Sequence, residues 1–345
     1  MRRRRKVWII LLAVPVMLLA ADTVYWWIVA DRLEQGFAAW VAQRRARGWI
    51  EDNAATRRGG WPLAATLSIP AISLVNGGPA LPRSVGWSAA RVVLRVALTR
   101  PDVLEILPEG RQQLRIPGGP DISYVAKDLR LTLPLQAREW PSFIEADTDN
   151  LRADTPAGAV TVRRMRLHLD LNPDAGAGEP GVAATLRVRE ASPPPGIVRP
   201  LGPSIADLEA DAVLSGPFRA DGERLADAAA GWRDGGGSLE IRHLALSWGP
   251  LDLTASATLA LDDQLQPAGT GNARIIGYAE TLDALAAHAV ISPSAATAAK
   301  AVLSLLANAP ADGSRPEVEI PVTLQSRTLS MRQVPLLRLP ELEWP

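Results

Sequence analysis

The sequence of 345 residues contains no cysteine, which excludes disulfide bonds, thiolate zinc sites, iron–sulfur ligation and cysteine nucleophiles. Its three histidines, His168, His243 and His288, have none of the spacings that pair histidines around a metal ion. Lysine plus arginine number 37, as do aspartate plus glutamate, so no net charge attracts a nucleic acid. These absences predict no metal, no cofactor and no nucleic-acid partner.

Motifs of the common enzyme classes are also missing. The sequence has no G-x-S-x-G nucleophile elbow, no H-E-x-x-H zinc motif and no phosphate-binding loop. The segment GTGNAR from Gly269 lacks the third glycine that dinucleotide binding requires. Asp262 with Asp263 is typical of a solvated turn rather than of a metal site. We therefore expect that the protein is not an enzyme, and we assign no catalytic residues.

The N-terminus carries the strongest signal in the sequence. Five basic residues, 2–6, precede an apolar run that extends from Val7 to Ala30 and is interrupted only by Asp22 and Thr23. At about 1.5 Å per residue, a helix over this run is about 36 Å long, which is enough to cross a bilayer. Because positive charge stays on the cytoplasmic side, everything after the run should be exported.

A cleaved signal peptide is the alternative interpretation of this run. Signal peptidase prefers two small residues before its cut, and of Leu19 and Ala21 only the second is small. Trp8 near one end and Trp26 and Trp27 near the other suit the membrane interfaces, where indole rings lie at headgroup depth. We therefore predict a retained anchor in the bacterial inner membrane, crossing once, with a cytoplasmic N-terminus and a periplasmic body.

From Trp61 onward, apolar residues recur at every second position, which is typical of strands with one buried face. Leucines at 129, 131, 133 and 135 alternate with polar residues, and His168 falls on the polar side of a similar stretch, 165–171. The run from Leu239 to Leu261 contains the turn 248–250 and predicts a long hairpin. Further strands are expected at Leu63–Ile69, Val92–Leu98, Leu104–Leu107, Leu186–Arg189, Leu208–Leu214 and Val318–Leu324.

Helical spacing marks three later segments, Glu223–Trp232, Tyr278–His288 and Ala295–Ala307, and the last two resemble a helical hairpin that covers one face of a sheet. Strands in runs with segregated helices predict an α+β fold dominated by strands. We expect a large curved antiparallel sheet with a few covering helices, preceded by one transmembrane helix. The lack of strand–helix alternation argues against a parallel nucleotide-binding sheet.

The expected organisation has five parts. They are a cytoplasmic tip and transmembrane anchor at 1–30, a juxtamembrane helix at 31–48, a first β-rich half at 49–191, a proline-rich segment at 192–204, and a second β-rich half with the helical hairpin at 205–345. The proline-rich segment is either a domain boundary or a stiff loop inside one sheet. The juxtamembrane helix either lies on anionic lipid or packs its apolar stripe on the body.

Three stretches carry a family resemblance: RGGWPLAATLSIPAISL, LALSWGPLDLTASATLALDDQLQPAGTGNARIIGY and PVTLQSRTLSMRQVPLLRLPELEWP. They resemble an alphaproteobacterial family of membrane-anchored envelope proteins classed as a domain of unknown function. More loosely, Leu329–Leu339 resembles the closing motif of AsmA-type envelope proteins, with Ser326, Arg327 and Arg332 where glycines are usual. The first resemblance implies location and topology without chemistry, and the second implies a lipid-binding β groove.

Two functions follow as expectations. The first is a protein that binds or guides lipid, with phospholipid as its partner and the inner membrane contacted through residues 7–30. Its apolar groove is predicted to be lined by Leu131, Leu133, Leu244, Leu246, Leu253 and Leu259, although such leucines are commonly plain core residues. The alternative is a non-enzymatic assembly or regulatory scaffold that binds other envelope proteins through edge strands or through Leu336–Trp344.

Overall fold

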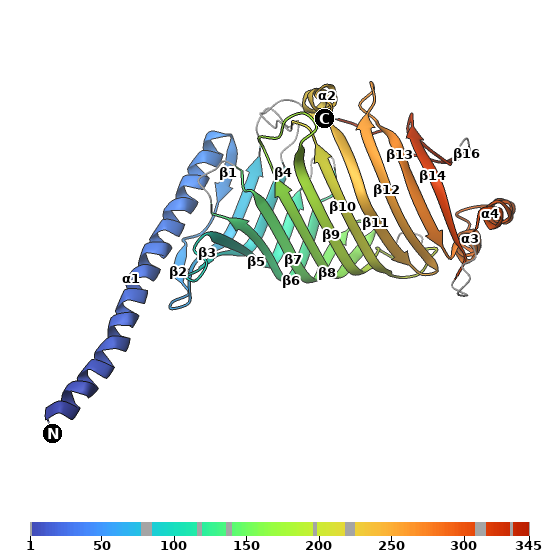
Figure 1. Cartoon of the computed structure of the whole chain (residues 1–345). Helices are drawn as coiled ribbons and strands as arrows, with labels where there is room; N and C mark the ends of the chain where they lie inside the picture. The colour runs from blue at the N-terminus through green and yellow to red at the C-terminus, as the bar shows by residue number, and fades with distance from the viewer. Residues whose placement is uncertain are drawn as a thin grey trace.

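The computed structural model describes residues 2–76, 85–115, 119–135, 140–195, 199–217, 225–307, 315–331 and 334–344, except for the side chains of residues 2–13, 15, 85, 225 and 334–337. Within these ranges, sixteen strands form one antiparallel sheet with four helices around it (Figure 1). The predicted fold, an α+β arrangement dominated by a large curved antiparallel sheet, is therefore confirmed.

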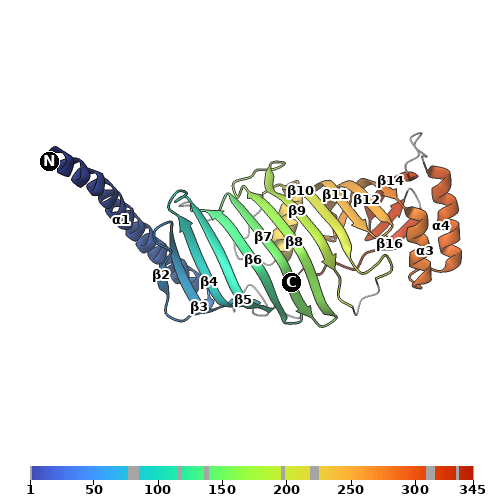
Figure 2. The ribbon, with the colours of Figure 1, turned by 90° about the horizontal axis from the view of Figure 1, so that it is seen from below.

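Strand order in the sheet follows the order of the chain, from β1 and β3 through β16, while β2 pairs only with β3. The strands are β1 (Trp49–Asp52), β2 (Arg57–Gly59), β3 (Ala64–Asn76), β4 (Val85–Ala97), β5 (Val103–Arg115), β6 (Ile122–Pro134), β7 (Phe143–Thr155), β8 (Gly158–Leu171), β9 (Pro180–Ser192), β10 (Ile205–Ser215), β11 (Ser238–Trp248), β12 (Leu251–Leu261), β13 (Pro267–Ile276), β14 (Glu317–Gln325), β15 (Thr328–Met331) and β16 (Val334–Arg338). Most are longer than an average strand, and neighbours in the sheet are also neighbours in the chain, joined by short connections, by the segment after β9, or by the helices between β10 and β11 and between β13 and β14. The result is a long meander with α1 at one end and both α3 and α4 at the other (Figure 2).

The first helix, α1 (Arg2–Ala46), is continuous through both the predicted anchor and the predicted juxtamembrane segment. Its second half packs on β1, β3 and β4, and Leu33 lies in a buried cluster with Leu67 and Leu94, among others. The apolar stripe therefore packs on the body. Among the residues whose side chains the structure describes, no helix has a stretch both long and apolar enough to cross a bilayer. Residues 7–13 and 15 of the predicted anchor lie outside that description.

The three later helices lie close to their predicted positions, at α2 (Leu225–Asp234), α3 (Tyr278–Ala287) and α4 (Pro293–Leu306). The side chain of Ser292 accepts a hydrogen bond from the Ala295 amide, and Pro293 occupies the first turn of α4, so this helix starts where its sequence caps it. α3 and α4 form the expected hairpin, which stands at the far end of the sheet from α1 (Figure 2).

The proline-rich segment 192–204 connects two strands that pair with each other along their length. Ile205 of β10 lies opposite Ala191 of β9, and the pairing continues to Ser215 opposite Pro180. The sheet therefore continues from β9 to β10 without interruption, and the segment is a connection between two paired strands.

Candidate functional site

The six leucines expected to line a groove lie on one face of the sheet. Leu246 lies directly opposite Leu253, and residues directly opposite each other in an antiparallel pair point to the same face. Leu259 shares this face with Leu253 because side chains alternate along β12, and Leu244 shares it because it lies opposite Ala255 of the same set. We call it the inner face.

A single row of apolar residues crosses twelve strands on the inner face and joins Leu131 to Leu244. Its members, each directly opposite the next, are Ile320, Ala273, Ala255, Leu244, Ala210, Leu186, Leu167, Ala146, Leu131, Ile106, Leu94 and Leu67. Neighbouring strands lie about 4.8 Å apart, so the row is roughly 50 Å long. Leu133 lies two residues from Leu131 and therefore on the same face, opposite Leu104.

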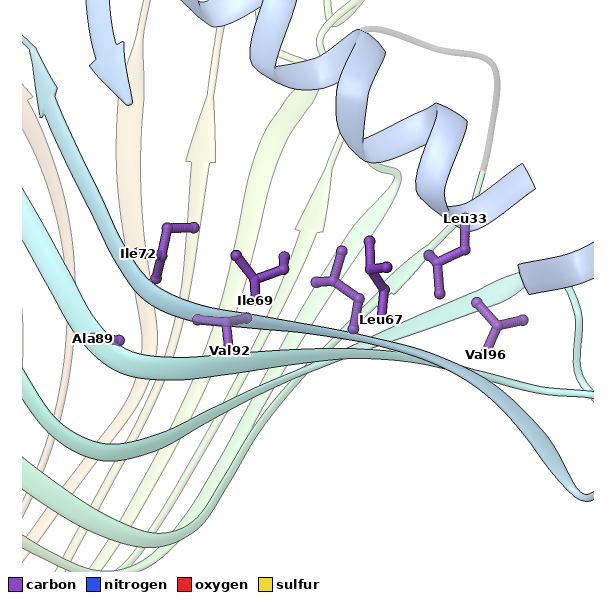
Figure 3. Packing of buried hydrophobic residues seen from close by; sticks show 8 residues of the cluster. Leu33, Leu67, Ile69, Ile72, Ala89, Val92 and Val96 are labelled. Carbon is purple, nitrogen blue, oxygen red and sulfur yellow. The ribbon is translucent and has the colours of Figure 1, made fainter. Parts of the chain in front are cut away.

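The two ends of this row are covered, while its middle is open. At the first end, Leu67 is fully buried and Leu94 is 8% exposed beneath α1, and Figure 3 shows β3 and β4 bending around this cluster on the side where α1 lies. At the other end, Ile320 is 5% exposed in β14, a strand that α4 contacts. Between these ends, every member except Ala146 is only partly buried. The inner face thus carries an apolar row that is buried at its ends and mostly part-exposed between them, and we call this row the trough.

The apolar alternation shifts by one residue partway along several strands, and the shift coincides with a backbone feature. In β3, Leu67 and Ile69 lie in the buried cluster, Ala71 has a φ of 51°, and Ile72 and Leu74 then continue the same cluster. Left-handed residues occupy the equivalent stretch of other strands, at Gly110, Asp128, Asn150 and Glu190. These kinks bend the strands and keep apolar residues on the inner face on both sides of the bend.

The opposite, outer face is polar. Cross-strand ion pairs run along it: Arg95–Glu105, Arg130–Glu105, Arg166–Asp147, Arg164–Asp149 and Arg189–Asp207. The Arg164 guanidinium donates to Asp149 and holds the pKa of that carboxyl below its usual value. His168 lies on this face between Glu145 and Asp170, where its sequence pattern places it. The sheet is therefore amphipathic: its outer face carries charged side chains in contact with water, and its inner face carries apolar side chains.

The side chain of Gln112 lies on the inner face and makes no hydrogen bond. Nothing in the sequence pattern predicts a buried polar residue at this position. Gln112 of β5 lies opposite Ala89 and Tyr124, is 1% exposed, and makes no hydrogen bond through either side-chain polar atom. Tyr124 beside it accepts a hydrogen bond of 2.9 Å from Trp87, and burial raises the pKa of the Tyr124 phenol although this hydrogen bond acts in the opposite direction. Such a buried amide costs stability.

The three tryptophans of the predicted anchor differ in what the structure shows of them. Trp8 lies outside the described side chains. Trp26 is partly buried, and its indole N–H donates to the carbonyl oxygens of Gly59 at 3.2 Å and Ala64 at 3.0 Å. Trp27, on the next position of α1, is 57% exposed.

The C-terminal tail is bound to its own chain. The side chain of Gln266 donates to the Leu342 carbonyl at 3.1 Å and accepts from the Leu342 amide at 2.9 Å, and the Trp344 indole donates to the Leu265 carbonyl at 2.9 Å. These contacts hold the tail against the turn between β12 and β13. The preceding hairpin turn between β14 and β15 has left-handed Ser326 and Arg327, at positions where a turn of this kind favours glycine or asparagine.

In the part of the chain that the structure describes, no group of three or more histidine, aspartate or glutamate side chains lies together in a way that could hold a metal ion. Comparison with known proteins adds one match. Residues 26–340 match a family described as "Uncharacterized protein conserved in bacteria (DUF2125)". No curated protein and no solved structure matches the chain.

Proposed function

Because the chain belongs to this family of uncharacterized bacterial proteins, whose description assigns no activity, we propose a function from the geometry of the sheet. The protein is a membrane-anchored periplasmic protein whose inner face binds or guides the acyl chains of envelope lipids. The observation that carries this proposal is the apolar row across twelve strands, which is buried at its ends and, apart from Ala146, only partly buried between them.

The extent of the trough favours acyl chains over a compact ligand. Soluble proteins rarely leave long contiguous apolar surfaces in water, and such surfaces commonly mark a binding site. The hydrocarbon core of a bilayer is about 30 Å thick, so one acyl chain spans about 15 Å. A row of roughly 50 Å has room for several acyl chains lying along or across it.

Anchoring in the membrane is supported by the surface of α1 ahead of its contact with the sheet. Large apolar side chains between residues 14 and 28 are exposed, and Met17 at 77% and Leu18 at 66% are the most open of them. Such a surface is costly in water and suits lipid. Basic residues 2–6 then orient the helix with its N-terminus in the cytoplasm and the body in the periplasm. The trough begins where α1 meets the sheet, so it starts next to the bilayer.

A scaffold that binds other envelope proteins is the alternative function. Its main support in the sequence is the tail Leu336–Trp344, which would need to be available to a partner. The hydrogen bonds of Leu342 and Trp344 to the turn at 265–266 use the polar groups that a partner would contact. This arrangement favours the lipid proposal. The resemblance to AsmA-type and alphaproteobacterial envelope proteins is part of the same proposal and rests on the sequence stretches alone.

Photocrosslinking in bacterial cells tests the proposal on the full chain. A benzophenone amino acid replaces Leu253 on the inner face, or its neighbour Thr254 on the outer face as a matched control, and cells are grown with radiolabelled acetate to label acyl chains. We expect labelled lipid on the chain after illumination at position 253 and not at position 254, because side chains alternate between faces. Leu259→Glu should remove the label from position 253 without lowering the amount of protein.

Two outcomes contradict the lipid proposal. Equal labelling at positions 253 and 254 would mean that the reagent only samples nearby membrane. A crosslink from position 253 to another protein, without labelled lipid, would instead favour the scaffold.

A further inference from the structure

The turn between β2 and β3 exposes apolar side chains that no contact within the chain explains. Trp61 is 47% exposed and Leu63 is 77% exposed, and Pro62 between them is also exposed. The turn closes through a hydrogen bond of 3.0 Å from the Ala64 amide to the Gly60 carbonyl. Because the turn is closed on itself, these side chains stand out from the sheet as a small apolar tip. We call residues 60–63 the apolar tip.

The apolar tip is fixed beside α1. The indole N–H of Trp26 donates to the carbonyls of Gly59 and Ala64, the two residues that flank the tip. Farther along α1, Arg58 of β2 pairs with Asp31 at 2.9 Å and also with Glu34. β2 and its turn therefore cannot move away from the helix without breaking these contacts. Figure 1 shows the turn beside α1, on the side of the sheet from which the N-terminal half of the helix emerges.

The position of Trp26 sets the depth of the apolar tip. Residues 7–30 form the proposed anchor, so Trp26 and Trp27 lie near its periplasmic end, where indole rings reside at headgroup depth. Since Trp26 is bonded to both sides of the tip, Trp61 and Leu63 lie at a similar depth.

The chemistry around the apolar tip matches the surface of an anionic bilayer. Tryptophan and leucine are side chains that enter the interfacial region of a membrane. The Leu98 amide donates to the Leu63 carbonyl at 3.1 Å, which brings the turn between β4 and β5, with exposed Arg100, next to the tip. Arg57 at the start of β2 is exposed as well. In such an arrangement the apolar side chains can contact the acyl chains, while the flanking arginines can bind the lipid phosphates at the surface of the bilayer.

We propose that residues 60–63 insert into the periplasmic surface of the membrane beside α1, as a second contact that fixes the orientation of the sheet. This inference rests on the membrane anchoring in the proposed function. A single helix lets the body rotate about the membrane normal and tilt, whereas a second contact restricts tilt. The first strands of the trough are thereby held at a constant height above the lipid surface.

The absence of cysteine makes a direct test possible, because a single introduced cysteine is the only thiol in the chain. The full chain is reconstituted into vesicles of phosphatidylcholine and phosphatidylglycerol, carrying an environment-sensitive NBD fluorophore on Leu63→Cys. Leu18→Cys reports on the anchor, and Thr254→Cys on the outer face is the control away from the membrane. Lipids brominated along the acyl chain quench only a fluorophore that reaches the bilayer.

We expect loss of NBD intensity at positions 18 and 63 and no loss at position 254. Quenching at position 18 without quenching at position 63 would overturn the inference and leave the anchor intact. Quenching at neither position would contradict membrane anchoring itself. A water-soluble quencher supplies one more comparison. If the fluorophore at position 63 is already shielded from this quencher without vesicles, and vesicles add no shielding, the tip contacts protein and the bilayer proposal is wrong.

A backbone variant supplies an independent check. Gly60 has a φ of 89°, and a Cβ at this position would lie 2.5 Å from the Ala64 carbonyl oxygen, so Gly60→Ala must distort the turn. We expect weaker quenching at position 63 in this variant with unchanged quenching at position 18. Gly36→Ala is the matched control, because a Cβ there meets nothing within 4 Å. Unchanged quenching at position 63 in Gly60→Ala would show that the turn geometry does not determine insertion.

Discussion

The guanidinium of Arg45, near the end of α1, donates to the carboxylate of Glu51 in β1 across 2.8 Å. The side chain of Glu51 is 1% exposed, whereas that of Arg45 is 60% exposed. The second carboxylate oxygen of Glu51 has no hydrogen-bond partner. Arg45 is therefore a counter-charge of a buried carboxylate at the junction between helix and sheet, and water can also reach this arginine.

Removal of that cation should weaken the junction. Arg45→Ala removes this counter-charge from the buried Glu51, and we expect the free energy of unfolding to fall by about 2–3 kcal/mol, at or below the lower end of the range for breaking a buried pair because water reaches the arginine. Urea unfolding followed by circular dichroism measures the change. Arg163→Ala, which breaks the exposed pair with Glu190, is the control and should change stability much less. Equal effects of the two variants would contradict this account of Glu51.

The unpartnered amide of Gln112 predicts a stabilising substitution. Gln112→Leu removes two buried polar atoms that make no hydrogen bond and keeps a side chain of similar size. We expect the free energy of unfolding to rise by about 1 kcal/mol. Gln113→Leu, at the exposed neighbouring position, is the control and should give no gain. A loss of stability in Gln112→Leu would mean that the amide is bonded in solution, for example to water.

Tyr124 predicts how stability changes at alkaline pH. Burial raises the pKa of its phenol above the unfolded value of about 10, so the unfolded chain loses this proton first as pH rises. The neutral phenol therefore contributes in full to the free energy of unfolding below the unfolded pKa. This contribution is lost as pH rises through the folded pKa. The chain has three tyrosines, and phenolate absorbance should show a highest-pH component that disappears in Tyr124→Phe. If that component persists in Tyr124→Phe, it belongs to another tyrosine.

Much of the sheet could be predicted from the sequence because its strands are amphipathic. The alternating stretch 165–171 lies within β8 and the stretch 129–135 lies within β6 up to Pro134, and the polar side of both strands faces water. The hairpin at 239–261 was predictable for the same reason, since its two arms alternate and the turn at 248–250 separates them. The same alternation explains why six leucines selected from separate strands lie together on the inner face.

Alternation alone could not predict which face a residue occupies beyond a kink, because the two-residue period shifts there. In β7, Ala146 and Thr148 face inward, Asn150 adopts a φ of 50°, and the alternation then resumes one residue later. A strict two-residue period would place the following residues on the wrong face. Pairing also has to be known before Gln112 can be located next to Tyr124, because these residues come from different strands. The contact of Trp26 with β2 and β3 likewise depends on tertiary packing.

Truncation of a leucine should lower the free energy of unfolding much more at the covered end of the trough than in its open middle. Leu67 is fully buried beneath α1, so Leu67→Ala should lower the free energy of unfolding by about 2–5 kcal/mol. Leu186 belongs to the same row but is only partly buried, so Leu186→Ala should cost roughly 1 kcal/mol, because water already reaches the side chain and no cavity forms. Both changes are measured by urea unfolding of the lipid-free chain. Equal and large costs would mean that the middle of the row is a filled core, and a filled core leaves no surface on which an acyl chain could bind.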